Sequence, residues 1–258
     1  MIFDTHMHTE LSSDSEMKIS SIIQTKDALN IGVILTDHLD LNYYKKNEFR
    51  VDLDKFFTLY SPYRNDSLLL GVEIGLSSSI LLENQKISSN YPFDFIIGSV
   101  HSVKDEDIYL TYSTKGLSRD EYFNTYFEEA IKYIQEFSNF DSLGHIDYPC
   151  RYCNFSDNNF SIIEHGKYLK KIFSILIKRN QALEINTRRL NLKEVYPSTF
   201  EIYKFYAECG GKYVTLGSDA HTKDAISTNF NIALALCKEL SLTPVYFKNR
   251  KMIEIKDI

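Results

Sequence analysis

The stretch Ile2-Phe3-Asp4-Thr5-His6-Met7-His8 begins with two apolar residues and ends with two histidines. A short run of this kind predicts a buried strand, and side chains two positions apart on a strand share a face. His6 and His8 are therefore spaced to bind one metal ion together. Such a pair is weak support when it stands alone, because core packing explains most isolated pairs.

Six further runs rich in Ile, Val, Leu or Phe follow along the chain, with amphipathic segments between them. Strands that alternate with helices predict an α/β fold with a parallel sheet, closed here into a barrel. Barrel enzymes carry their active sites at the C-terminal ends of the strands. The seven predicted strands are Ile2–His6, Gly32–Thr36, Leu68–Glu73, Phe93–Ser99, Ser142–His145, Ala182–Asn186 and Tyr213–Gly217.

Helices are predicted between these strands. Ser118-Arg-Asp-Glu121 has the spacing of a capping box, in which the hydroxyl and the carboxylate each accept a free backbone N–H. It begins an apolar-periodic run that reaches about Phe137. Further helices are predicted over Phe160–Lys178, Ser198–Glu208 and Ala225–Leu240.

Six of the seven histidines lie at the ends of the predicted strands, several of them beside a carboxylate. A single histidine there is often a hydrogen-bonded structural residue, but six together point to a shared site. The seventh, His165, falls inside a helix and is predicted to lie on the surface. The strand-end groups are His6 and His8, Asp37-His38, Glu73, His101, His145-Ile-Asp147, and Asp219-Ala-His221, with Asp14 in the loop after His8.

Imidazoles combined with carboxylates suit zinc, iron or manganese, whereas calcium prefers oxygen ligands alone. At about three protein ligands per catalytic ion, this set suffices for three divalent ions. Three such ions and three carboxylates leave a strongly positive site, which would bind an anion. The nine candidate ligands are His6, His8, Asp14, His38, Glu73, His101, His145, Asp219 and His221.

The length, composition and charge of the chain limit which classes of protein it can belong to. With 258 residues, of which 43% are hydrophobic, the chain suits one domain over residues 1–258. We find no signal-peptide pattern and no membrane-spanning run, so a cytoplasmic location is expected. A net charge of −6 argues against a basic nucleic-acid-binding surface. Nothing in the sequence indicates an oligomeric state.

Cys150 and Cys153 have CxxC spacing. A zinc site of this type would need a second pair of cysteines, which the sequence lacks. A redox pair is the alternative, but two reduced thiols in a loop are the preferred interpretation.

The strand-end residues resemble the polymerase and histidinol phosphatase (PHP) superfamily. The GHID form at His145 and the GSDAH form at Asp219 are most similar to its histidinol-phosphate phosphatases of histidine biosynthesis. The resemblance implies a distorted seven-stranded β/α barrel with three metal ions. It also implies a ligand set for each ion: His6, His8, Glu73 and Asp219 for the first, Glu73, His101 and His145 for the second, and Asp14, His38 and His221 for the third.

The family further implies basic residues that bind a phosphate group. Arg151 and Arg188 each follow a predicted strand end, and Arg188 is preferred over its neighbour Arg189 because it lies closer to the strand. An arginine fork can donate two bonds to one phosphate. We expect a small phosphate monoester as substrate, attacked by a hydroxide that metal ions activate. A metal-bound water, Asp219 or an imidazole such as that of His38 would protonate the leaving alkoxide.

Three other functions are compatible with parts of this pattern. Another PHP phosphoesterase, acting on nucleotides, would share the metal site and differ in its substrate loops. Amidohydrolase chemistry also uses an HxH pair, but no strand end presents the bridging lysine common in those enzymes. A metal-binding module without activity would not need all nine ligands. Glu184, Asn186, Asp4, Asp37 and Asp147 are candidates for orienting the ligands.

Overall fold

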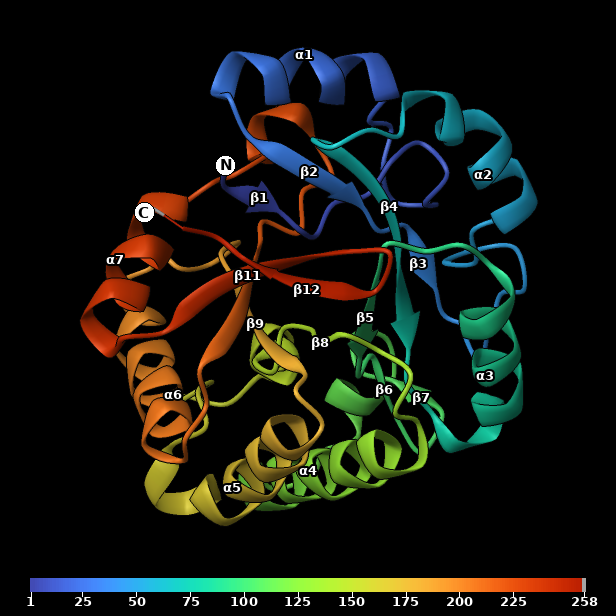
Figure 1. Ribbon diagram of the computed structural model, residues 1–258. Helices are drawn as coiled ribbons and strands as arrows, with labels where there is room; N and C mark the ends of the chain where they lie inside the picture. Colours follow the sequence, from blue (N-terminus) through green and yellow to red (C-terminus); the bar gives the residue numbers. More distant parts are fainter. Residues whose placement is uncertain (257–258) are drawn as a thin grey trace.

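The computed structural model describes residues 1–256 and shows an α/β fold in which parallel strands alternate with helices (Figure 1). Each of the seven runs predicted as strands contains one. Neighbours pair in parallel in the sheet order β1-β2-β4-β5-β8-β9-β10. These strands are β1 (Phe3–Asp4), β2 (Gly32–Leu35), β4 (Leu68–Gly75), β5 (Phe95–Ser99), β8 (Ser142–Leu143), β9 (Ala182–Asn186) and β10 (Tyr213–Gly217).

The central strands are apolar because both of their faces are covered. All eight residues of β4 are buried, as expected for a parallel strand between two packed layers. Figure 1 shows the helices lying around the outside of the strands. They are α1 (Ile19–Leu29), α2 (Leu53–Tyr60), α3 (Leu81–Asn90), α4 (Arg119–Glu136), α5 (Ile162–Lys178), α6 (Tyr196–Glu208) and α7 (Phe230–Leu240), with 3₁₀ turns η1 (Ser61–Tyr63), η2 (Ser78–Ile80), η3 (Tyr112–Thr114), η4 (Tyr148–Arg151) and η5 (Lys223–Ala225).

The first and seventh predicted strands meet at their C-terminal ends. Thr5 N donates to Leu216 O at 2.9 Å, and Asp219 N donates to His6 O at 2.8 Å. The sheet order itself runs on from β10 to β11 (Thr243–Lys248) and β12 (Lys251–Glu254). The α/β fold is therefore observed, and closure into a complete seven-stranded barrel stays a prediction.

Two helix predictions can be compared residue by residue. The capping box at Ser118 and Glu121 is confirmed, and α4 begins directly after it. The last helix begins at Phe230 and not at Ala225 as predicted. The intervening segment is tied to the site instead, since Ser227 N donates to Asp4 Oδ2 at 2.9 Å.

The β11–β12 hairpin was not predicted from the sequence. Its two-residue turn, Asn249-Arg250, has positive φ at both positions (50° and 62°), as a type I′ turn requires. Arg250 Nε donates to Asp141 Oδ2 at 2.6 Å, and Asn249 N donates to Asp94 Oδ1 at 2.9 Å. Asp94 and Asp141 immediately precede β5 and β8, so the hairpin covers the N-terminal ends of the strands, where Figure 1 shows it crossing them.

Two smaller strand pairs complete the sheets. The short β3 (His38–Leu39) pairs in parallel with β4. The strands β6 (Ser102–Val103) and β7 (Glu106–Asp107) form a separate antiparallel pair.

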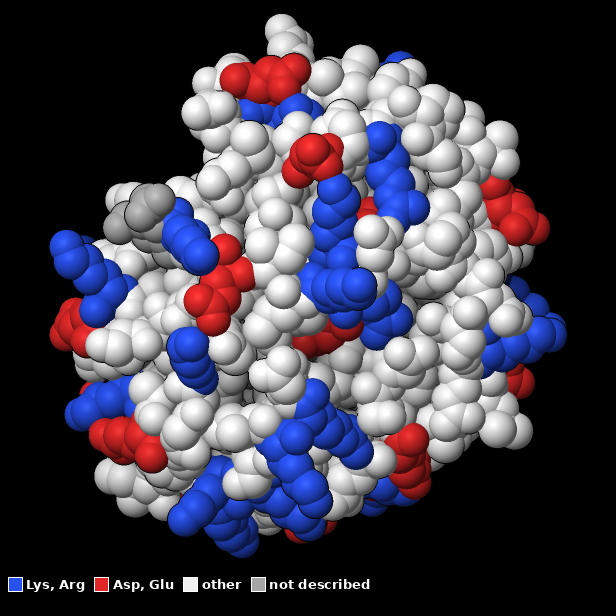
Figure 2. All heavy atoms as spheres, viewed as in Figure 1, with Lys and Arg blue, Asp and Glu red and all other residues white. Residues whose placement is uncertain are grey.

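Figure 2, viewed from the same side as Figure 1, shows lysine and arginine side chains gathered on the face that carries the hairpin. Two cations at the hairpin are paired with acids, which lowers the positive charge there. Arg64 contacts Asp94 at 2.6 Å, and Lys248 contacts Asp66.

Within residues 1–256, no helix combines the length and the apolar character that a membrane span needs. Cys150 and Cys153 are both buried and both carry free thiols. Burial raises the pKa of the Cys150 thiol well above its usual value, which disfavours the reactive thiolate.

The prediction that His165 lies on the surface is wrong. Its side chain is 1% exposed and packs against Phe123, Phe127 and Phe160, with ring centroids 5.5, 5.5 and 6.1 Å away. The residue lies on the apolar face of α5, which is turned toward α4. Burial lowers the pKa of His165 below its ordinary value, so the fold favours the neutral imidazole.

We expect His165→Leu to make the protein less sensitive to acid. Because the folded-state pKa is lowered, the unfolded chain takes up this proton first, and stability is lost as the pH falls below about 6.5. Melting curves between pH 5 and pH 8 should show a smaller fall for the variant, by about 2–4 °C for each kcal/mol removed. Parallel curves for both proteins would contradict this role.

Candidate metal centre

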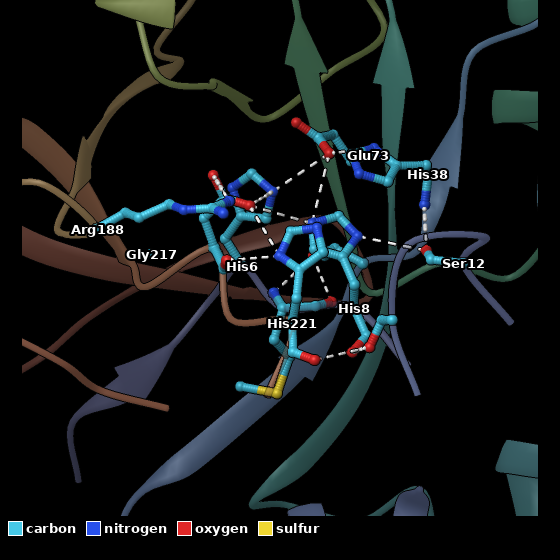
Figure 3. A network of polar contacts seen from close by, with 12 residues as sticks. His6, His8, Ser12, His38, Glu73, Arg188, Gly217 and His221 are labelled. Carbon is cyan, nitrogen blue, oxygen red and sulfur yellow. Dashed lines mark hydrogen bonds and ion pairs between the residues drawn. The ribbon is translucent and has the colours of Figure 1, made fainter. Parts of the chain in front are cut away.

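The nine predicted ligands lie in one mostly buried cluster at the C-terminal ends of the strands, part of which Figure 3 shows. Eight of them, joined by Asp40, form groups whose ligand atoms lie within 4.8 Å of one another. The ninth, Asp14, contacts His221 Nε2 at 2.8 Å. The groups are His6, His8 and Asp219; His6, Glu73 and His145; His8, His38 and His221; and His38, Asp40 and His101.

His6 and His8 leave the end of β1 on the same face, as the two-residue spacing predicts. Both are fully buried, and Asp219 Oδ1 lies 3.4 Å from His8 Nε2 and 3.9 Å from His6 Nε2. Asp219 has a φ of 54°, a left-handed conformation that is uncommon outside glycine. The hydrogen bond from Asp219 N to His6 O fixes this conformation and directs the carboxylate toward the histidines.

Glu73 lies at the centre of the cluster. Its Oε1 is 2.8 Å from His145 Nε2 and 3.2 Å from His101 Nε2, and its Oε2 is 2.8 Å from His38 Nδ1. Burial raises the pKa of Glu73, but the charges of His6, His101 and His38 outweigh burial and hold that pKa well below its usual value. The carboxylate is therefore ionised and placed to contact several cations at once.

A third group gathers at the more exposed side of the cluster. Asp14 Oδ2 lies 2.8 Å from His221 Nε2 and 3.5 Å from His38 Nε2. Burial lowers the pKa of His38, but Glu73 and Asp14 reverse this effect and raise the pKa to about 10. Burial, with His38 and His221 nearby, lowers the pKa of His8 well below its usual value.

Several buried nitrogen and oxygen atoms of the cluster make no well-aligned hydrogen bond within the described residues, even where an ion-pair distance is short. They include His6 Nε2, His8 Nε2, His38 Nδ1 and Glu73 Oε2. Each unsatisfied buried polar atom costs about 1–3 kcal/mol, and shared cations would satisfy several of them together. Imidazole nitrogens and carboxylate oxygens are ligands that zinc, iron and manganese accept, so these residues fit divalent metal ions.

A cavity of about 240 Å³ opens over the cluster, and Arg151 and Arg188 both line it. Arg151 Nη1 donates to Asp219 Oδ2 at 2.8 Å, and its side chain is 7% exposed. Arg188 Nη1 lies 3.6 Å from the same oxygen, and its side chain is 51% exposed. Two cations of different burial therefore face the cavity.

Arg189 turns away from this cavity. Its Nη1 lies 3.7 Å from Asp147 Oδ2, beneath the loop that carries Arg151. Asp147 Oδ1 is also 3.9 Å from Arg151 Nη2, so this acid lies between two arginines and contacts no imidazole ligand.

Among the predicted orienting groups, Glu184 contacts the imidazole of a predicted ligand directly. Its Oε1 lies 2.6 Å from His6 Nδ1, and its Oε2 accepts the backbone N–H of His145 at 2.7 Å. Asn186 Nδ2 donates to Glu184 Oε2 at 3.2 Å and supports it from behind. One carboxylate thereby fixes an imidazole from β1 and the backbone that follows β8.

Asp4 and Asp37 hold the backbone of the site together. Asp4 accepts the N–H and the hydroxyl of Ser218, and burial raises its pKa to about 6. Asp37 accepts both donors of Thr9 and the hydroxyl of Ser12. Both acids position the loops that carry ligands.

Asp40 is the member of the cluster that the sequence reasoning missed. It is 6% exposed, and its Oδ1 lies 2.8 Å from His101 Nδ1. The sequence spacing could have predicted that Asp40 belongs to the site, because Asp40 follows His38 at the same two-residue spacing that links His6 and His8.

Comparison with known proteins places this cluster in a family. A model of the PHP domain matches residues 4–188. The probable histidinol-phosphatase of Clostridium acetobutylicum is 42% identical over 252 residues, covering 98% of this chain and 99% of that protein. The chain belongs to the PHP domain family.

Two further similar proteins match most of the chain. The histidinol-phosphatase of Lactococcus lactis is 29% identical over 227 residues, covering 84% of this chain and 83% of that protein. A crystal structure of histidinol phosphate phosphatase from that organism, in complex with zinc, L-histidinol and phosphate, superposes with a TM-score of 0.87 at 26% identity. The match covers 98% of both chains, so the two structures share the α/β fold over nearly their whole length.

Proposed function

We propose that this chain is a metal-dependent histidinol-phosphatase that hydrolyses L-histidinol phosphate to L-histidinol and phosphate, a step of histidine biosynthesis. The observation that carries the proposal is the convergence of imidazoles and carboxylates beneath two arginines in one cavity. The relatives named histidinol-phosphatase support the choice of substrate. We place the enzyme in the cytoplasm, as the sequence predicts.

The proposed ligand sets are those that the family resemblance implies. The observed group His6, His8 and Asp219 falls within the first set, whereas the other observed groups combine residues from more than one set. His6, His8, Glu73 and Asp219 would hold one ion, and Glu73, His101 and His145 a second, with Glu73 shared. The third set is Asp14, His38 and His221, joined by contacts of 2.8 and 3.5 Å. Zinc, iron and manganese all suit these donors, and the zinc in the L. lactis structure supports the first of them.

Divalent ions bound there would lower the pKa of water toward neutrality and offset charge on the phosphoryl oxygens. Arg151 and Arg188 approach the cavity from the side of Asp219 and would bind the phosphoryl group. Asp219 and His38 both line the cavity and are the proposed proton relays: either would take up the proton that the attacking water gives up and pass it to the leaving alkoxide. The partly exposed Arg188 lies where the substrate would enter.

We further propose that residues 1–258 act as a single domain whose sheet closes as a distorted (β/α)₇ barrel. The bond from Thr5 N to Leu216 O and the parallel bridge between Met7 and Ala220 support this closure.

Phosphate release from a panel of phosphomonoesters tests the proposed reaction. We expect the highest kcat/KM for L-histidinol phosphate, with more than two metal ions per chain in unchelated protein. A higher kcat/KM for nucleotides would overturn the choice of substrate. Ammonia release without phosphate would indicate amidohydrolase chemistry instead.

Replacing Arg188 with alanine is expected to raise KM for L-histidinol phosphate and lower kcat/KM by about 10-fold, the effect of losing one charge-assisted hydrogen bond. Metal content should stay unchanged, because Arg188 is not a ligand. Arg189→Ala is the matched comparison, since its side chain faces Asp147 and not the cavity. Equal losses in the two variants would contradict the assignment of Arg188 to the phosphate.

A further inference from the structure

We propose that Asp40 is a positioning residue that fixes the imidazole of His101, and that Gly75 is glycine because the Asp40 carboxylate occupies the space of a side chain there. This inference rests on the proposed metal-dependent function. It assigns roles to two residues that the proposed ligand sets leave out.

The contact between Asp40 and His101 determines which imidazole nitrogen faces the metal centre. Asp40 Oδ1 lies 2.8 Å from His101 Nδ1, and both residues are buried. The other nitrogen, His101 Nε2, lies 3.2 Å from Glu73 Oε1 and 3.3 Å from His145 Nε2. Because Nδ1–H donates to the carboxylate, Nε2 keeps its lone pair free for a metal ion.

Asp40 can take this position only because residue 75 has no side chain. A Cβ built on Gly75 would lie 2.0 Å from Asp40 Oδ1 and 2.9 Å from Asp40 Cγ. Gly75 ends β4, beside β3. The glycines with positive φ in the described chain are Gly116 and Gly210, so the backbone at Gly75 would accept alanine. The constraint on this position is therefore the carboxylate and not the conformation.

The same arrangement recurs at one other strand end, and a related close approach occurs at a third place. A Cβ on Gly217 would lie 2.2 Å from Glu184 Oε1, the atom that contacts His6 Nδ1. Figure 3 shows Gly217 beside His6 in the polar network.

At the third place, a Cβ on Gly144 would lie 2.3 Å from Ser99 Oγ, which donates to Glu73 Oε1 at 2.6 Å. Neighbouring parallel strands lie about 4.8 Å apart. A polar group from one strand can therefore cross to a ligand only over a residue without a side chain. Asp40 reaches across β4 and Glu184 across β10 in this way. Ser99 (β5) and Glu73 (β4) instead lie on adjacent strands, with Gly144 on the other side of β5.

Asp40 also lies near His38, with 3.6 Å between Asp40 Oδ2 and His38 Nδ1, so a direct ligand role must be separated from positioning. Removing a metal ligand lowers the number of ions that the protein binds at saturation. Removing a positioning group leaves that number unchanged but weakens metal binding, typically by about 10–100-fold.

A double-mutant cycle tests the proposal. Asp40→Ala, Gly75→Ala and the double variant are stripped with a chelator and titrated with Zn²⁺ alone, and circular dichroism confirms that each remains folded. We expect each single variant to bind Zn²⁺ about 10–100-fold more weakly with unchanged stoichiometry, and kcat to fall while KM changes little. The double variant should be no weaker than Asp40→Ala, because Gly75 acts only by making room for the carboxylate.

Asp40→Asn retains an acceptor for His101 and should recover part of the Zn²⁺ affinity. Gly166→Ala is the control glycine, since its Cβ would meet nothing closer than 3.4 Å in helix α5. Additive losses in the double variant, unchanged affinity in Asp40→Ala, or the loss of one whole ion would overturn the proposal. Absence of phosphatase activity in the wild type would refute the proposed function and still leave the Zn²⁺ titrations interpretable.

Discussion

Glu73→Gln is expected to remove metal ions from at least two of the proposed positions. It should also lower kcat by more than ~100-fold. Even groups that only orient metal ligands contribute about 10–100-fold, and Glu73 contacts the histidines of more than one set directly. Glutamine has nearly the same shape as glutamate but lacks the charge that offsets neighbouring cations. The loss should therefore exceed that of any other single substitution described above.

Elemental analysis of freshly purified protein, measured beside phosphate release, checks this expectation. Glu239→Gln on the exposed face of α7 is the matched control and should keep both metal content and activity. Full metal content and full activity in Glu73→Gln would show that the carboxylate bridges no ions.

Arg151→Lys is expected to lower kcat/KM for L-histidinol phosphate by about 100-fold, a larger loss than for Arg188→Ala. Arg151 is nearly buried, and its guanidinium lies over the ring of Tyr148 at 5.6 Å. Charges are screened less in such a place than at the surface, so each hydrogen bond to a phosphoryl oxygen contributes more. Lysine keeps the charge but loses the planar fork that binds two oxygens at once.

Arg151 also contacts Asp219, so its effect on the metal ions must be measured separately. Unchanged metal content with a lower kcat/KM would place Arg151 on the substrate. A loss of metal ions in Arg151→Lys would instead assign it to the support of Asp219.

The alternation of strands and helices, and the strand ends at which the candidate ligands lie, could be predicted from the sequence. Each predicted strand is a short apolar run, and parallel strands bring their C-terminal ends together, so residues as distant as His6 and His221 were placed in one site. The motif glycines Gly144 and Gly217 acquire a physical reason only in the structure, because the groups that fill their empty side-chain positions come from other strands.

The features that were missed depend on tertiary contacts. The turn at Asn249-Arg250 lacks the glycine of a typical hairpin signal and is held by Asp94 and Asp141, which are remote in sequence. His165 was placed on the surface because a polar residue in a helix is usually exposed, and its aromatic surroundings belong partly to another helix. The spacing of Asp40 from His38 could have placed it in the site, but its partner His101, 61 residues away, is identified only by the structure.

The bond between Thr5 and Leu216 spans 211 residues, which has a consequence for biosynthesis. The strand β1 must wait until β10 has been made before it gains this neighbour. Contacts of such long sequence separation form late, because the chain must close a large loop to make them. Proposed metal ligands lie on both sides of this span, at His6 and at His221. Nascent chains that end before His221 should therefore lack a complete site.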